Sequence, residues 1–297
     1  MHPDDLSLEN VSAEFNYSVV FPFEKRFDIR EGTEWMRQYW TRSILYSFCY
    51  VLFIFLGQEW MRQRPRYDLR LPLTLWNSVL SAFSIAGVFR TYPEFFSVLY
   101  RKGFTHSVCA ASFSIGVTGC WAWLFALSKA LELGDTVFVV LRKQQLIFLH
   151  WYHHVTVLVY TWYSFPDHTA PGRWFIVMNY TVHSFMYTYY ACRSLKFSLP
   201  RFVPMTITFM QLAQMVVGTY INVAVWMIKG GGASCTQSYA NIRYSLIMYA
   251  SYFVLFAHFF YKVYFGRGKF AAPSITVSEK HEQLPLDLDN DRLKKDV

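Results

Sequence analysis

Three histidines, His150, His153 and His154, stand within five residues of one another in a strongly apolar stretch of the chain. On a helix, positions i, i+3 and i+4 share one face, so the three imidazoles are expected to point the same way. Ionisable side chains inside a bilayer are energetically unfavourable, and such a group marks a functional site. A neutral imidazole can attack an activated carbonyl or act as a general base. The pattern therefore predicts a buried catalytic site.

A lysine and two carboxylates precede the histidines at intervals of three residues: Lys129, Glu132 and Asp135. This spacing places them along one edge of a helix. In one interpretation, a carboxylate orients and polarises one of the histidines. In the other, the three residues form a charge-balanced ladder that joins their helix to its neighbours. Both interpretations keep all three residues as candidates for the catalytic site.

Polar residues continue along the next two apolar stretches. Asn179 and His183 are four residues apart, so they share a helix face and are further catalytic candidates. Glutamines in the stretch that follows either contact a ligand or hydrogen-bond between helices. The candidates for substrate contacts in these two stretches are Tyr187, Tyr190, Gln211 and Gln214.

The composition indicates where these residues lie. Of the 297 residues, 54% are apolar and 20% aromatic, while only 16% are charged, against about 25% in soluble domains. These values exclude an ordinary soluble protein and a disordered one, and they favour an all-α membrane protein. A spanning helix needs about 20 apolar residues, and seven stretches qualify as transmembrane helices: 41–57, 71–89, 112–131 (extending to 141), 146–165, 174–192, 202–228 and 244–265.

Basic residues suggest how the chain is oriented. The net charge is +8, and most Lys and Arg residues lie between the apolar stretches. These residues are expected to set the topology and to contact membrane lipid, not nucleic acid. The more basic side is predicted to be cytosolic. The chain then divides into a lumenal segment (1–40), a seven-helix domain (41–265) and a disordered cytosolic tail (266–297).

Short motifs at the two ends agree with this orientation. Asn10 and Asn16 begin glycosylation sequons, which are used only on the lumenal side. Lys294 and Lys295 resemble the dilysine retrieval signal of endoplasmic reticulum membrane proteins, which works only on a cytosolic tail. The alternative interpretation is a solvated basic tail.

Cysteines and the remaining histidines are assigned by location. Cys109 and Cys235 fall in two loops that are both lumenal in this topology, where an oxidising environment favours a disulfide. The alternative is a pair of free thiols. His258 is expected to be structural. The other histidines are expected to face solvent: His2, His106, His168 and His281.

The polar residues form four motifs in a fixed order on successive stretches. They are Lys129-x-x-Glu132-x-x-Asp135-Thr136, His150-x-x-His153-His154, Asn179-x-x-x-His183-x-x-Met186-Tyr187-x-Tyr189-Tyr190, and Thr208-x-x-Gln211-x-x-Gln214. In this order they resemble the very-long-chain fatty acid elongase family, over about residues 30–265. Trp151 is similar to the branch that elongates palmitate-type saturated and monounsaturated chains.

The resemblance implies an acyltransferase, a 3-oxoacyl-CoA synthase that condenses a C12–C18 acyl-CoA with malonyl-CoA and uses no metal or other cofactor. It also implies that six of the seven helices form a ring around an acyl tunnel in the endoplasmic reticulum membrane. The reductase, dehydratase and enoyl reductase of the cycle are expected partners by analogy. The oligomeric state stays open, a homodimer being one option.

Roles within this reaction follow as hypotheses. His153 is the nucleophile that forms an acyl-imidazole, or the histidines act as general bases without a covalent step. His183, Asn179 and His150 are donors to the enolate oxygen, and Asp135 or Glu132 fixes an imidazole tautomer. Four basic residues either attract the phosphates of CoA or serve topology alone: Arg142, Lys143, Arg193 and Lys196.

Two other classes compete with this interpretation. A di-iron membrane desaturase or hydroxylase also carries histidine motifs, but it needs more imidazole ligands than the apolar stretches contain. A seven-helix receptor or transporter has the same number of spans, but it has no evident use for three histidines on one helix face.

Overall fold

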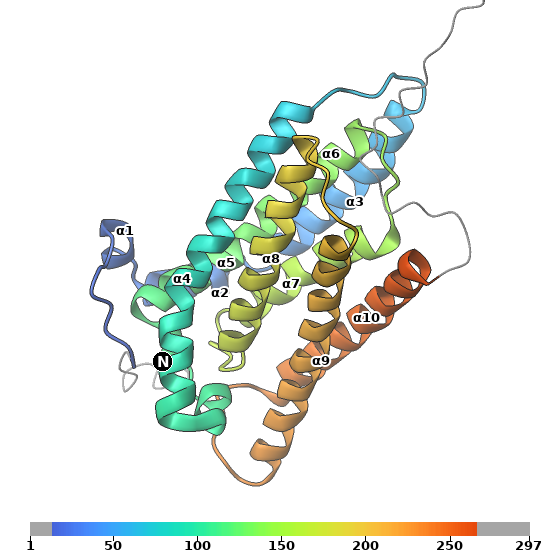
Figure 1. Ribbon diagram of the computed structural model, residues 1–297. Coiled ribbons are helices and arrows are strands. Elements are labelled where there is room, and N and C mark those ends of the chain that lie inside the picture. The colour runs from blue at the N-terminus through green and yellow to red at the C-terminus, as the bar shows by residue number, and fades with distance from the viewer. Residues whose placement is uncertain (1–13, 266–297) are drawn as a thin grey trace, which may run out of the picture.

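A computed structural model describes residues 14–265, which are mainly helical (Figure 1). Within these residues no strand is present. Asn10, Lys294, Lys295 and the 266–297 tail lie outside the described residues. The helices are α1 Pro22–Lys25, α2 Ile29–Tyr39, α3 Arg42–Met61, α4 Arg70–Cys109, α5 Gly116–Leu131, α6 Asp135–Leu141, α7 Phe148–Ser164, α8 Gly172–Ser194, α9 Phe202–Gly230 and α10 Tyr239–Tyr264, with short 3-10 turns at Ser112–Ser114 and Glu132–Gly134.

Every predicted apolar stretch is helical. The stretch at 112–141 divides into α5 and α6, because a 3-10 turn at Glu132–Gly134 interrupts it. Helix α4 continues 20 residues beyond its predicted end at 89, and it bends at Gly103, where φ is +80° and favours a residue without a side chain. Among the described residues, α3, α4, α9 and α10 are long and apolar enough to cross a membrane. That all seven segments cross stays a prediction.

Six of the helices form a closed ring. Helix α4 packs against α5, α5 against α7, α7 against α10, α10 against α9, α9 against α8, and α8 returns to α4. Helix α3 stands outside this ring and contacts α6 and α7 (Figure 1). The predicted all-α fold with a six-helix ring is therefore confirmed. Of the seven predicted apolar stretches, the one that forms α3 lies outside the ring.

The segment before α3 packs on one end of the ring. Glu24 of α1 is buried, and it accepts hydrogen bonds from Arg90 of α4 and from the indole of Trp121 in α5. In α2, Thr33 and Met36 face the protein, and the Thr33 hydroxyl lies 2.9 Å from Nε2 of His168, in the turn between α7 and α8. These contacts hold α1 and α2 across the end of the ring.

The same end is closed by a disulfide and a buried ion pair. Cys109 and Cys235 are joined by a disulfide bond, which is the pairing expected from the sequence. Arg173 is 1% exposed and pairs with Glu94 of α4, and it also donates to the carbonyl of Ser107. We call this the disulfide end of the ring.

The disulfide generates a testable expectation. Cys109 and Cys235 are 126 residues apart, and a cross-link over so long a span stabilises a fold by about 4 to 5 kcal/mol on the chain-entropy account. Replacing both residues by serine should lower the midpoint of thermal unfolding by several degrees. Peptide masses with and without reduction report the bond directly.

Cys192, a half-buried free cysteine in α8, provides the control. Cys192→Ser should leave the midpoint unchanged. Peptides containing Cys109 and Cys235 whose masses do not change on reduction would contradict the pairing.

Candidate active site

The three histidines of α7 lie together inside the bundle. The ring centres of His150 and His154 are 4.6 Å apart, and those of His153 and His154 are 5.6 Å apart. Nε2 of His150 is 2.9 Å from the hydroxyl of Thr136, which in turn is 2.6 Å from the hydroxyl of Tyr50 in α3. The helical spacing therefore gathers the imidazoles as predicted, and a chain of hydroxyl groups orients His150.

Asp135 is held rigidly beside His154. One of its oxygens accepts a hydrogen bond from the indole of Trp76 at 2.6 Å, and the other accepts from the hydroxyl of Tyr187 at 2.8 Å. The distance from Asp135 Oδ2 to Nε2 of His154 is 4.0 Å, too long for a hydrogen bond. Trp76 and Tyr187 therefore set the position of Asp135, which lies beside His154 without a hydrogen bond to it.

A second network joins α5 to α8. Lys129 is only 2% exposed, and its amino group donates to Glu132 at 2.8 Å and to Oδ1 of Asn179 at 2.9 Å. The amide nitrogen of Asn179 then faces Nε2 of His183 at 3.3 Å, and Glu132 lies 3.8 Å from Nδ1 of the same ring. This arrangement favours the proton of His183 on Nδ1, toward the carboxylate.

The structure has features of both interpretations of the Lys129 motif. Lys129 pairs with Glu132 and joins two helices through Asn179, and the Glu132 carboxylate lies beside a histidine. That histidine is His183 of α8.

His153 differs from its neighbours. Among the residues that the structure describes, neither of its ring nitrogens is hydrogen-bonded, and neither belongs to the buried atoms that lack a partner. Its ring lies 5.0 Å from that of Tyr252 in α10. The imidazole is half-buried, and no hydrogen bond within the described residues fixes its ring.

The other predicted substrate contacts occupy varied positions. The hydroxyl of Tyr187 is already used by Asp135, and the residue is 2% exposed. Tyr190 is 41% exposed and packs on Tyr189, without a hydrogen bond to the histidine cluster. Gln211 of α9 donates to the sulfur of Met186 at 3.5 Å, whereas Oε1 of Gln214 is buried without a partner. Tyr187 therefore serves the cluster as a support.

The four basic candidates lie where α6 and α8 end, at the end of the bundle opposite the disulfide (Figure 1). Lys143 donates to the carbonyl of Arg62, and Arg193 donates to that of Phe197. Lys196 is exposed and Arg142 is half-buried. They form a basic surface at this end.

The sequence did not indicate several residues that contact the site, and the prediction for His168 was wrong. Tyr50, Trp76 and Tyr252 contact the catalytic candidates from other helices, and no spacing in the sequence signals those contacts. His168 was expected to face solvent but is buried beside Thr33, because α2 covers it. Burial lowers the pKa of His168 to about 4, so this ring is neutral at pH 7.

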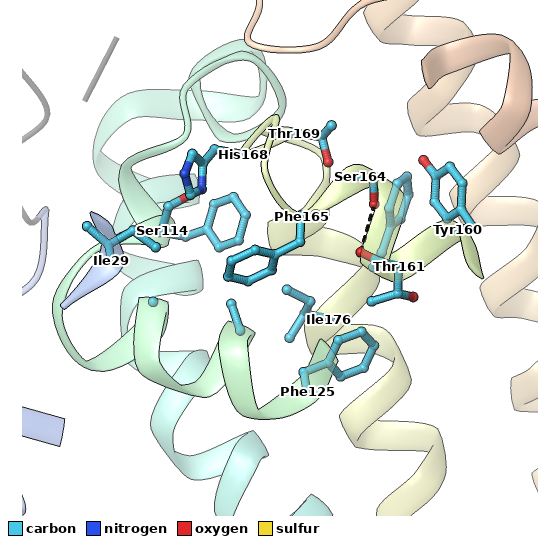
Figure 2. Close-up of a pocket in the computed structure, with 15 residues that line it drawn as sticks. Ile29, Ser114, Phe125, Tyr160, Thr161, Ser164, Phe165, His168, Thr169 and Ile176 are labelled. Carbon is cyan, nitrogen blue, oxygen red and sulfur yellow. Dashed lines mark hydrogen bonds between the residues drawn. The ribbon is translucent and has the colours of Figure 1, made fainter. Parts of the chain in front are cut away.

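An apolar cavity of about 70 Å³ lies toward the disulfide end (Figure 2). Its walls come mainly from α5, α7 and α8, the helices that carry Lys129, His153 and Asn179, and the lining residues lie about one to three helical turns nearer that end. Phe125 links the two regions, since it lines the cavity and its ring lies 4.1 Å below the Lys129 ammonium. Other lining residues are Ile29, Phe113, Ala122, Tyr160, Phe165, Phe175 and Ile176.

The reactive groups and an apolar cavity on the same three helices define a membrane enzyme that acts on a lipid-like substrate. The ELO family, described as GNS1/SUR4, matches residues 35–271, so the chain belongs to this family. The resemblance expected from the four motifs is confirmed.

Relatives agree with this assignment. The chain is 52% identical over 263 residues to very long chain fatty acid elongase 6 of Drosophila melanogaster, covering 87% of this chain and 83% of the fly protein. The elongase 6 proteins of Gallus gallus and Homo sapiens are 50% and 47% identical, each over 85% of this chain and 97% of the relative. These relatives support the predicted palmitate-type branch.

The desaturase alternative finds no support. The relatives are elongases, and between residues 14 and 265 no three His, Cys, Asp or Glu side chains are grouped to hold a metal ion.

The Trp76 contact can be tested. Trp76→Phe removes the N–H group that fixes Asp135 while it keeps an aromatic ring. Because hydrogen bonds to charged groups contribute about 1.5 to 3 kcal/mol, turnover should fall by roughly tenfold or more. The measurement is the rate of elongation with purified protein, together with the thermal midpoint.

Trp60→Phe in α3 is the control, since Trp60 is 49% exposed and outside the ring. A Trp76→Phe protein with full activity would show that Asp135 does not need this donor.

Proposed function

We propose that the protein is a fatty acid elongase that condenses a long-chain acyl-CoA with malonyl-CoA to give 3-oxoacyl-CoA, carbon dioxide and free CoA. The observation that carries this proposal is an imidazole without hydrogen bonds, His153, beside a fixed polar network and on a helix that lines an apolar cavity. Membership of the ELO family and relatives named elongases support it. The reaction needs no metal or cofactor besides the two CoA substrates.

The first step is acyl transfer to His153. The lone pair of a ring nitrogen attacks the thioester carbonyl, the C–S bond breaks, and CoA leaves as a thiolate. The proton on the other ring nitrogen passes to the thiolate, which leaves a neutral acyl-imidazole and free CoA. His153 suits this role because no hydrogen bond occupies its nitrogens, whereas His150 is bonded to Thr136.

The second step is decarboxylation and condensation. The bond between the malonyl carboxylate and the α-carbon breaks, its electron pair forms an enolate, and carbon dioxide leaves. The enolate carbon attacks the acyl-imidazole and releases the imidazole, which takes up a proton from solvent. Donors near the enolate oxygen lower this barrier, and the Lys129 network places a positive charge and the Asn179 amide next to His183.

General-base catalysis without a covalent intermediate is the second candidate. His154 favours it, because its ring lies between His150 and His153 and within 4.0 Å of the Asp135 carboxylate. In that mechanism a histidine would activate malonyl-CoA directly. The two mechanisms differ in whether CoA is released before malonyl-CoA binds.

The acyl chain enters the ring and ends in the cavity near the disulfide end. Phe113, Phe165 and Phe175 line this cavity, and their bulk is expected to limit chain length. The expected substrates are saturated and monounsaturated C12–C18 acyl chains. CoA stays at the opposite end, where Arg142, Lys143, Arg193 and Lys196 attract its phosphates.

The protein acts in the endoplasmic reticulum membrane, with its N-terminus in the lumen and its C-terminus in the cytosol. The basic surface then faces the cytosol and the disulfide faces the oxidising lumen. Asn16 is exposed and would carry the lumenal glycan, while Asn179 is buried in α8 and stays unmodified. The reductase, dehydratase and enoyl reductase of the cycle are the expected partners.

The nucleophile is testable with purified protein. Incubation with palmitoyl-CoA alone should release free CoA in an amount close to one per enzyme, and the acyl group should remain on the peptide that contains His153. His153→Ala should abolish both signals and lower elongation by several orders of magnitude, because the covalent route is lost.

His258→Ala in α10 is the matched control, since His258 is exposed and lies outside the cluster. Elongation by wild-type protein without early CoA release would favour the general-base route. Failure to elongate any acyl-CoA would reject the proposed function.

The residues that line the cavity give a second expectation, which concerns the preferred acyl chain length. Ser164→Leu fills the space and should shorten the preferred acyl chain, whereas Phe165→Ala enlarges it and should lengthen the chain. Product chain lengths measured with a panel of acyl-CoAs report both shifts. Phe96→Ala, on an exposed face of α4, should leave the products unchanged. Identical products from all three variants would place the chain end elsewhere.

A further inference from the structure

Two hydroxyl groups in a line connect the histidine cluster to α3, the helix outside the ring. The hydroxyl of Tyr50 lies 2.6 Å from Oγ1 of Thr136, and this oxygen lies 2.9 Å from Nε2 of His150. Tyr50 is 6% exposed and Thr136 is fully buried. The direction in which the protons point along this line decides which nitrogen of His150 carries a proton.

Each hydroxyl group has one proton to donate. Among the described residues, the Tyr50 hydroxyl has Thr136 as its hydrogen-bond partner and no other. If Thr136 donated to Tyr50, the phenol proton would be buried without an acceptor, which is unfavourable. Tyr50 therefore donates to Thr136. The proton of Thr136 is then directed to its other partner, Nε2 of His150.

This direction fixes the tautomer of His150. Because Nε2 accepts a hydrogen bond, the neutral ring carries its proton on Nδ1. Within residues 14–265, Nδ1 of His150 has no hydrogen bond, and it does not belong to the buried atoms without a partner. An N–H group at Nδ1 can donate to a substrate, whereas the opposite tautomer could only accept there.

We infer that Tyr50 is a positioning residue for the condensation step. Acting through Thr136, it holds His150 in the tautomer whose Nδ1–H group donates to the thioester oxygen of malonyl-CoA. The inference rests on the proposed condensation, in which negative charge gathers on that oxygen as the enolate forms, and a donor held in place beforehand lowers the barrier. Helix α3, which lies outside the ring, thus sets the proton of a histidine inside it.

The tautomer can be measured directly by nitrogen NMR of the full-length protein with isotope-labelled histidine, with the signals of His150 assigned by their loss in His150→Gln. The wild-type protein should carry the proton on Nδ1. Tyr50→Phe removes the hydroxyl group but keeps the ring, whose centre lies 6.4 Å from that of His154. In this variant the ratio of the Nε2–H form to the Nδ1–H form should rise roughly tenfold, since the hydrogen bond that directs Thr136 is lost.

Kinetics separate this role from a purely structural one. In Tyr50→Phe, kcat/KM for palmitoyl-CoA and the early release of CoA should stay unchanged, because they report acyl transfer to His153. By contrast, kcat/KM for malonyl-CoA should fall by roughly tenfold. Thr136→Val should have the same effect. The double variant should lose no more than either single variant, because the two residues act in one chain.

Tyr92→Phe is the matched control. Tyr92 of α4 is also paired with a threonine, since its hydroxyl lies 2.7 Å from that of Thr181, but Thr181 donates to the carbonyl of Val177 and not to a histidine. Its kinetics should match those of the wild type.

Three results would overturn the inference: a wild-type proton on Nε2 of His150, an unchanged kcat/KM for malonyl-CoA in Tyr50→Phe, or an equal fall in kcat/KM for both substrates. In each case the wild-type protein still elongates palmitoyl-CoA, and the proposed function stands. A wild-type protein that elongates no acyl-CoA would reject the proposed function, and this inference with it.

Discussion

The buried ammonium group of Lys129 is the constraint around which the site is built. A charge at 2% exposure between apolar helices is tolerated only when it is paired and hydrogen-bonded. Glu132 and Asn179 meet that need from two helices of the ring. Once these partners are in place, the amide of Asn179 can only face His183, and α5 and α8 are held at a fixed spacing. The condition that makes a buried charge tolerable therefore also orients a catalytic candidate.

The two ends of the helix ring carry different groups. At one end α1, α2, the Cys109–Cys235 disulfide and the Arg173–Glu94 pair close the bundle and leave a small cavity beneath them. At the other end, α6 and α8 finish in basic residues. In the proposed reaction the lipid chain and the highly charged carrier occupy opposite ends of the ring, with the histidines between them.

The histidines of the cluster differ in which of their nitrogens are hydrogen-bonded, and the proposed roles rest on that difference. His150 and His183 have partners that fix their rings, and Asp135 places its charge near His154. Among the described residues the ring nitrogens of both His153 and His154 lack hydrogen bonds, but Nδ1 of His154 is buried, whereas neither nitrogen of His153 belongs to the buried atoms without a partner. A nucleophile needs an available lone pair, while groups that stabilise an oxyanion need to be held in place beforehand. The same imidazole chemistry can therefore serve different tasks at neighbouring positions.

The sequence by itself determined the helical membrane class, the seven apolar stretches and the residues of the four motifs, since hydropathy and helical spacing are local properties. Only the tertiary structure decided that Trp76 and Tyr187 hold Asp135, that Lys129 acts on His183 through Asn179, and that α2 buries His168. These contacts join helices far apart in the chain, and their geometry depends on how the ring closes. The length of α4 also escaped prediction, because buried ion pairs at Arg90 and Glu94 let a charged segment continue as helix.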